Sequence, residues 1–110
     1  MSPEDARAEE LLQHRLTPAQ LHQLDHEGGL AVTSRIVQGL VYRIQRKTAY
    51  GVNVFLHGKQ IDEVCNVSTE RIPVADEVLS CYYLLLADEK EFIRIANCRT
   101  NRVRELLRVA

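Results

Sequence analysis

The sequence predicts an α+β domain in which N-terminal helices precede a three- to four-stranded antiparallel meander, and C-terminal helices pack on one face of that sheet. Three observations lead to this prediction. Helix-start signals dominate residues 1–28, β-branched and aromatic residues alternate with polar ones over 30–67, and apolar residues return to helical spacing over 74–110. We expect one domain over 1–110, because a chain of 110 residues buries enough surface to fold without metal or disulfide help.

Two short helices are expected before the sheet. Ser2 is followed by proline and two acidic residues, which is typical of a helix start. Thr17 begins a second helix, in which Gln20 can close a capping box. The pair Gly28-Gly29 supplies left-handed residues that end this helix.

Alternation with a period of two predicts strands in the middle of the chain. It runs through Leu40–Ile44 and Val52–Leu56, and the turn residues His57-Gly58-Lys59 predict a hairpin between the second run and 61–67. The isoleucine and valine residues around the first run also fit helical spacing. We favour strands there, because Gly39 would lie inside the helix at a cost of about 1 kcal/mol.

Helices are expected again after Pro73. The spacing of apolar residues predicts a helix that begins at Val74, and Asp88 with Glu91 three residues later predicts a new N-cap. Thr100 is expected to cap a last helix whose apolar stripe is about two turns long, too short to hold a helix unaided. The residues of this stripe are Val103, Leu106, Leu107 and Ala110. We expect this helix to dock on the acidic segments of its own domain, with a homodimer contact as the alternative.

Charged residues alternate in sign from block to block, although the net charge of the chain is only −1. The net charges are −4 over residues 1–30, +5 over 31–60, −6 over 61–89 and +4 over 90–110. A protein with a nucleic-acid footprint usually has an overall basic balance as well. We therefore favour the interpretation that oppositely charged segments lie beside each other in the fold.

The second block contains a basic stretch, Val41–Lys59, without any carboxylate. Basic residues and tyrosines on a sheet are the ingredients of a platform for single-stranded nucleic acid. Because side chains alternate along a strand, however, Tyr42 is expected on the face opposite Arg43. We favour a solvated or acid-paired sheet face, with nucleic-acid binding as the alternative. The candidate residues for contact with a polyanion or a partner are Arg35, Arg43, Arg46, Lys47, Lys59, Arg102, Arg104 and Arg108.

No catalytic, cofactor-binding or metal-binding residue is predicted. His22 and His26 have the spacing of helical zinc ligands, but the glutamate that follows the first histidine in metalloproteases is absent, so exposed histidines are the favoured interpretation. The cysteines at 65, 81 and 98 fit neither a disulfide framework nor a zinc-ribbon spacing, and buried free thiols are expected. The scattered glycines form no phosphate-binding loop.

The N-terminus and the apolar runs indicate a soluble cytoplasmic protein. The first residues are acidic and helix-forming, whereas a secretory signal would be basic and then apolar. The longest apolar run, Cys81–Ala87, is far too short to cross a bilayer. No membrane partner is expected.

Short elements between Leu16 and Asn97 form a pattern over most of the chain. They are Leu16-Thr17-Pro18-Ala19-Gln20, Gly29-Leu30-Ala31-Val32, Tyr42-Arg43-Ile44, Gly51-Val52-Asn53-Val54, Gly58, Cys65, Pro73 with Asp76 and Leu79, Asp88-Glu89, Phe92 and Ala96-Asn97. This pattern resembles a family of small, uncharacterised bacterial α+β proteins, for which a phage origin is an alternative. The resemblance implies a fold and no known activity. Family members often have histidine two residues after the cysteine, whereas this chain has Val67, so no metal or redox role is carried over to Cys65.

The functional expectation is a small non-enzymatic protein that acts as an interaction or regulatory module. Its partner would be another protein or a second copy of the chain. The alternative is a nucleic-acid-binding accessory protein that uses the basic strand region 35–59. An enzyme without a recognisable motif is the third hypothesis.

Overall fold

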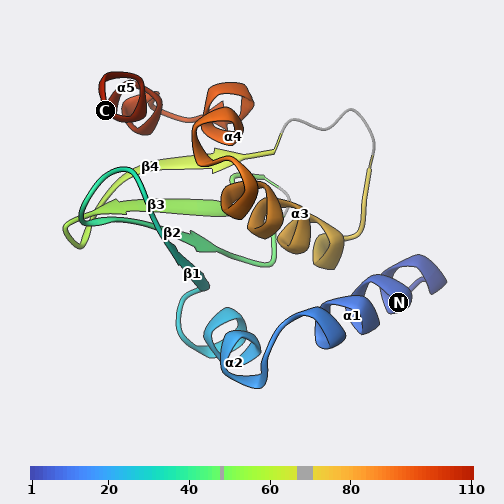
Figure 1. Ribbon diagram of the computed structural model, residues 1–110. Helices are drawn as coiled ribbons and strands as arrows, with labels where there is room; N and C mark the ends of the chain where they lie inside the picture. Colours follow the sequence, from blue (N-terminus) through green and yellow to red (C-terminus); the bar gives the residue numbers. More distant parts are fainter. Residues whose placement is uncertain (48, 67–70) are drawn as a thin grey trace.

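The computed structural model of the chain describes residues 1–47, 49–66 and 71–110. Two helices come first, followed by four strands, two further helices, a two-residue strand and a last helix (Figure 1). The helices are α1 (Pro3–Arg15), α2 (Pro18–His26), α3 (Val74–Ala87), α4 (Glu89–Ile95) and α5 (Arg102–Val109). The strands are β1 (Leu30–Thr33), β2 (Leu40–Ile44), β3 (Val52–Leu56), β4 (Lys59–Cys65) and β5 (Asn97–Cys98).

The strands form one antiparallel sheet in the order β1-β2-β3-β4-β5, in which each strand pairs with the next one along the chain. The predicted α+β class is confirmed, and the stretch around Leu40–Ile44 that also fitted a helix forms β2 and the turn before it. The meander is one strand longer than expected. This strand, β5, lies within 74–110, where we expected only helices and their connections, and it can form because Ala96 ends α4 with extended backbone. The end of the expected hairpin strand at Val67 lies outside the described residues.

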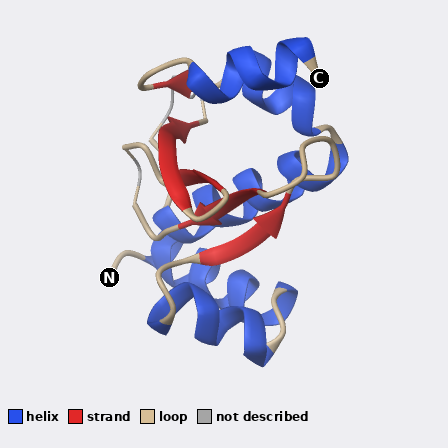
Figure 2. Cartoon of the chain, turned by 90° about the vertical axis from the view of Figure 1, so that its left-hand side faces the viewer, coloured by secondary structure: helices blue, strands red, loops and turns tan. Residues whose placement is uncertain are grey.

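Helices α3, α4 and α5 lie over one face of the sheet, and α1 packs against α3 (Figures 1 and 2). Side chains that point toward the helices are buried, whereas their neighbours along the strands are half-buried. The opposite face carries Val41, Arg43, Asn53 and Phe55, and no helix of the described chain covers it (Figure 2). The buried side chains of the sheet include Leu30, Leu40, Tyr42, Ile44, Val52, Val54 and Val64.

The first two helices begin and end as predicted. The Ser2 hydroxyl accepts the N–H of Asp5 at 3.1 Å. Thr17 and Gln20 form the capping box, since each side chain accepts the main-chain N–H of the other, at 3.2 and 2.9 Å. After α2, both residues of Gly28-Gly29 have positive φ.

Helix α2 lies along the outer edge of β1. Its Gln23 side chain accepts the main-chain N–H of Ala31 at 3.3 Å. The Gln20 amide donates to the Tyr82 hydroxyl of α3 at 2.9 Å. Helix α2 therefore joins the sheet edge to the helical layer.

The predicted hairpin turn joins β3 to β4. Leu56 pairs with Lys59, and the two residues between them, His57 and Gly58, have φ of 50° and 82°, the left-handed backbone that two-residue hairpin loops prefer. The His57 ring lies against Gly39 of the preceding turn. A Cβ built at Gly39 would lie 2.2 Å from Nδ1 of His57, so a side chain at that position would force the ring to move.

The C-terminal helices pack on the sheet as expected. Asp88 caps α4, since its carboxylate accepts the N–H of Glu91 at 3.1 Å. Helix α5 docks on α4, β4 and β5 of its own chain, with Val103 and Leu107 buried. Ala110, which we expected in the apolar stripe, is exposed.

The cap of α5 differs from the prediction. Asn101, not Thr100, holds the N-cap position, with left-handed backbone and no side-chain cap bond, although the Thr100 hydroxyl accepts the main-chain N–H of Arg102 at 3.3 Å. The carboxylate of Asp62 in β4 instead accepts the main-chain N–H groups of Thr100 at 2.9 Å and of Val103 at 3.2 Å. The acid reaches these amides because β4 lies directly under the start of α5, and it also opposes the positive end of the helix dipole.

Among the helices of the described residues, none is both long enough and apolar enough to span a membrane.

Candidate functional site: a groove between α1, α3 and the end of β4

The eight basic residues named as candidate contacts are spread over several surfaces, and Arg46 is bound within the protein. Its guanidinium donates to the Glu9 carboxylate of α1 through Nη1 and Nη2, at 2.7 and 2.8 Å, and to Asp25 of α2 through Nε at 2.7 Å. The hydrogen bonds from Arg46 hold the pKa of Glu9 below its usual value. Arg46 therefore links α1 and α2 to the end of β2, as the acid-paired interpretation expects.

Arg43 lies on the open face of the sheet, where Nη1 donates to the Glu27 carbonyl at 3.3 Å. Tyr42 points to the opposite side, as predicted, and its hydroxyl donates to Glu89 at 2.6 Å. Burial raises the pKa of the Tyr42 phenol. The aromatic residue that shares a face with Arg43 is Phe55, directly opposite Val41 on β2.

Four further candidates lie on other parts of the surface. Lys47 follows β2, Lys59 begins β4, and Arg102 begins α5; all three are exposed. Arg35 follows β1, and its guanidinium donates to the Leu86 carbonyl of α3. These positions do not form one continuous basic strip.

The two remaining candidates are arginines of α5. Arg104 donates to the carbonyls of Ile93 and Ala96, which end α4. Arg108 forms an ion pair with Glu105 of the same helix at 2.8 Å. Arg104 therefore holds two helices together, and Arg108 is already paired.

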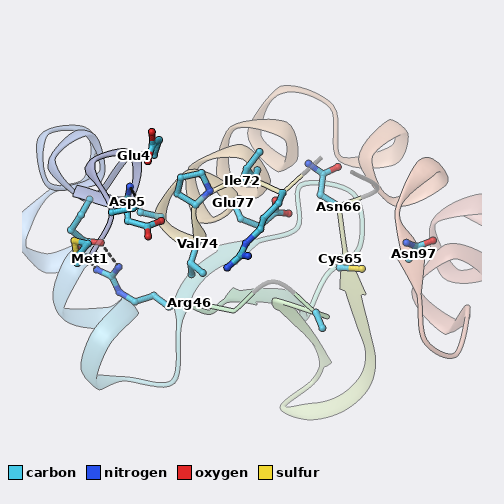
Figure 3. A pocket seen from close by; sticks show the side chains of 16 residues that line it. Met1, Glu4, Asp5, Arg46, Cys65, Asn66, Ile72, Val74, Glu77 and Asn97 are labelled. Carbon is cyan, nitrogen blue, oxygen red and sulfur yellow. Dashed lines mark hydrogen bonds and ion pairs between the residues drawn. The ribbon is translucent and has the colours of Figure 1, made fainter. Parts of the chain in front are cut away.

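A groove of about 1390 Å³ opens where the first turns of α1 and α3 meet the end of β4 (Figure 3). In the close-up, Glu4 comes from α1 on the left and Cys65 from β4 on the right, with Glu77 of α3 between them. The lining residues are Met1, Ser2, Glu4, Asp5, Glu9, Arg46, Ala49, Cys65, Asn66, Arg71, Ile72, Pro73, Val74, Ala75, Glu77 and Asn97.

Glu77 is a buried carboxylate on the wall of this groove. It lies in the first turn of α3 with only 7% of its surface exposed. One turn later, the Cys81 thiol donates to its Oε1 at 3.6 Å. Burial raises the pKa of the Glu77 carboxyl, and burial together with the neighbouring carboxylate raises the pKa of the Cys81 thiol to about 12. The groove thus contains a carboxylate that is costly to ionise and a thiol that stays protonated at neutral pH.

Two other carboxylates in the described part of the chain are buried. Asp62 accepts three main-chain N–H groups, at 2.8, 2.9 and 3.2 Å. Glu89 accepts two hydroxyl groups and one main-chain N–H, at 2.5, 2.6 and 3.1 Å. Both are fully engaged in joining elements of the fold, whereas Glu77 faces the groove.

The charges around the groove are unequal. Its lining side chains include four carboxylates and two guanidinium groups, and Arg46 is already paired outside the groove with Asp25. The acidic residues of the first turns of α1 and α3 stand at the positive ends of their helix dipoles. The charged lining residues are Glu4, Asp5, Glu9, Glu77, Arg46 and Arg71.

Sequence reasoning did not find this groove. The pattern assigns Glu77 only to the acidic first turn of a helix, and the groove residues come from distant parts of the chain. One signal was available. Glu77 and Cys81 are four residues apart, which places them on one side of a helix, and Val78 and Leu85 make that side apolar.

No group of three or more His, Cys, Asp or Glu side chains suited to a metal ion occurs in the ranges that the structure describes. His22 and His26 are exposed, with ring centroids 5.0 Å apart. All three cysteines are free, but only Cys81 is buried, whereas Cys65 and Cys98 are half-buried. The expectation of buried thiols is therefore met at Cys81 and not at the other two.

No family model, curated protein or solved structure matches this chain.

Proposed function

We propose that this chain is a small non-enzymatic module that binds a partner protein and takes a segment of that partner into the groove between α1, α3 and the end of β4. The observation that carries the proposal is the buried carboxylate of Glu77 on the wall of an open groove of about 1390 Å³. A carboxylate on the wall of an open groove can form a charge-assisted hydrogen bond with a group that a ligand brings.

The size and lining of the groove suit a peptide segment. Pockets for small molecules usually enclose about 300–1,000 Å³ and surround the ligand, whereas this groove is larger and open to solvent. Ile72, Pro73 and Val74 offer apolar contacts, and the amides of Asn66 and Asn97 offer hydrogen bonds. An extended segment needs both kinds of contact, because its main chain carries polar groups and its side chains are in part apolar.

The absence of catalysis is part of this proposal. The pKa of the Cys81 thiol lies at about 12, while a thiol nucleophile acts as the thiolate. The lining residues described for the groove include no histidine that could serve as a base. These features favour binding over covalent chemistry.

Selection from a library of random peptides displayed on phage, with the full chain as bait, tests the proposal. We expect bound peptides to shift the amide resonances of 72–77 and 65–66. Val74→Trp adds bulk inside the groove and should weaken binding by about tenfold or more. Val109→Trp is the matched control, since Val109 is 70% exposed on α5 and does not line the groove. Peptides that shift only other regions, or a selection that yields no binder, would remove the proposal.

A nucleic-acid-binding accessory role for region 35–59 is the second candidate. The observation in its favour is that Phe55 and Arg43 share the open face of the sheet, with Asn53 on the same face. An aromatic ring beside a guanidinium and an amide is a common surface for single-stranded nucleic acid. It ranks second because Tyr42 is buried and Arg46 is already paired.

The proposal includes a cytoplasmic location and membership of the bacterial family that residues 16–97 resemble. Neither the location nor the resemblance assigns an activity, so the peptide selection tests the proposed function whether or not they are correct.

A further inference from the structure

We infer that the segment taken up by the groove carries an arginine or lysine side chain, and that this cation forms an ion pair with Glu77. The inference rests on the proposed function and adds the chemistry of the partner to it. It follows from the hydrogen bonds of the buried carboxylates, the charges around the groove and the apolar walls beside Glu77.

Glu77 differs from the other buried carboxylates in what it accepts. Asp62 and Glu89 each accept three hydrogen bonds from hydroxyl or main-chain N–H groups. Among the described residues, only the Cys81 thiol donates a hydrogen bond to the Glu77 carboxylate, at 3.6 Å, and a thiol is a weak donor. None of the ion pairs found in those ranges includes Glu77. Within the described ranges, Glu77 therefore has a weak donor beside it and no cation.

A cation from the ligand would offset a cost that the folded chain bears at Glu77. Burial without a positive partner disfavours the ionised carboxylate, which is why its pKa is raised. An arginine or lysine placed there would form a charge-assisted hydrogen bond, which is stronger than a bond between neutral groups. The binding free energy would then include a contribution that a neutral side chain cannot make.

The charges around the groove favour a cation over an anion. Two helix N-termini face the groove and would by themselves attract an anion, but Glu4, Asp5 and Glu77 already occupy their first turns. Of the two arginines in the lining, Arg46 is held by carboxylates of α1 and α2. Arg71 alone does not balance the three acids.

The walls beside Glu77 fit the stem of a long basic side chain. Ile72, Val74 and Cys65 line the groove together with Glu77. Lysine and arginine bury their methylene groups along apolar surfaces while the charged end meets a polar partner. A short polar ligand would leave these walls uncovered.

The test uses the selected peptides with the wild-type chain, Glu77→Gln and Asp76→Asn. Glu77→Gln keeps the side-chain shape and an acceptor for the Cys81 thiol. Asp76→Asn removes the same charge from the neighbouring residue, which does not line the groove. We expect the peptides to share one basic position. Replacing it by citrulline should weaken binding to the wild type by about tenfold or more.

Glu77→Gln should weaken binding of the basic peptide by a similar factor. The citrulline peptide should bind the Glu77→Gln variant about as well as the basic peptide does, because both changes remove the same ion pair. Asp76→Asn should stay within about twofold of the wild type. The citrulline peptide is measured on the wild-type chain, so the test does not depend on the folding of a variant.

Other outcomes separate this inference from the proposed function. Peptides that bind in the groove but share no basic residue would refute the inference of an ion pair with Glu77, and so would basic peptides that bind the Glu77→Gln variant as tightly as the wild type. Either outcome would leave the groove as the binding site. A lack of groove-binding peptides would refute both. If agmatine alone bound as tightly as the basic peptides, the ligand would be a free amine, and the inference of a basic peptide would be wrong.

Discussion

Tyr42 and Glu89 lie 47 positions apart in the sequence, and the phenol of the first donates a hydrogen bond to the carboxylate of the second over 2.6 Å. The same carboxylate accepts the Ser34 hydroxyl at 2.5 Å and the main-chain N–H of Arg35 at 3.1 Å. One side chain at the start of α4 therefore fixes both the middle of β2 and the turn that follows β1.

Tyr42→Phe should lower the free energy of unfolding by about 1–3 kcal/mol, because it removes a donor from a buried carboxylate. Urea unfolding followed by circular dichroism measures the change. Tyr83→Phe is the control, since Tyr83 is 44% exposed, and it should leave stability within about 0.5 kcal/mol of the wild type. Equal effects of the two substitutions would contradict the importance of the Glu89 network.

Asp62→Ala should loosen the start of α5, because the amides of Thr100 and Val103 lose their acceptor. We expect a loss of about 2 kcal/mol in the free energy of unfolding, and faster hydrogen exchange at these two amides. Glu105→Gln is the comparison, because it removes a carboxylate from the exposed side of the same helix. Unchanged exchange at Val103 would show that the amides have another acceptor.

Glu77→Gln should change how stability depends on pH. The pKa of Glu77 is raised in the folded protein, so the folded state holds this proton more tightly than the unfolded state. Wild-type stability should therefore fall as the pH rises from about 4.3, the ordinary value of a glutamate, through the raised value in the fold. The glutamine variant lacks this fall. Relative to its stability in acid, it should be more stable than the wild type at neutral pH. Unfolding curves over a pH series test this, and a difference between the proteins that does not vary with pH would contradict it.

The double variant Arg43→Glu/Lys47→Glu tests the nucleic-acid alternative. If the open face of the sheet binds a polyanion, the wild type should bind single-stranded DNA or RNA with an affinity that falls steeply with salt, and the variant should bind more weakly. Fluorescence anisotropy at about 50 mM salt is a sensitive condition, because phosphate contacts are strongest at low salt. A wild-type chain that binds neither single- nor double-stranded nucleic acid there would remove this alternative.

Cys81 should react slowly with thiol reagents in the folded protein. Its thiol is buried, and its pKa of about 12 leaves almost no thiolate at neutral pH. Cys65 lines the groove and is half-buried, so it should be modified first. Mass spectrometry of peptides after timed alkylation distinguishes the two sites. Rapid modification of Cys81 without denaturant would show that the Glu77 pocket opens in solution.

Much of the fold could be predicted because local chemistry specifies it. The capping box of Thr17 and Gln20 needs only residues three apart, and the His57-Gly58 turn needs only two residues that accept left-handed backbone. Period-two alternation likewise placed Tyr42 and Arg43 on opposite faces. The two-residue strand β5 has no such signal, since it extends only because β4 lies beside it.

Contacts between distant segments explain what the sequence could not predict. A local rule assigns the N-cap of α5 to Thr100. The carboxylate of Asp62, 38 residues away from Thr100, accepts the main-chain N–H groups of Thr100 and Val103. The acid-paired interpretation of the basic block holds at Arg46, yet only the packing of α1 and α2 reveals that Glu9 and Asp25 are its partners. The burial of Glu77 depends in the same way on where α1 begins and where β4 ends, so no single stretch of the sequence predicts the groove.

The hydrogen bond from the main-chain N–H of Ala31 to the Gln23 side chain has a consequence beyond the joining of α2 to β1. An open strand edge is where copies of a protein add to one another and aggregate. Here α2 lies along the β1 edge, and the strand at the opposite edge, β5, is only two residues long. Release of α2 would free the Ala31 N–H for pairing with another chain, so a more stable α2 should make strand addition at this edge harder.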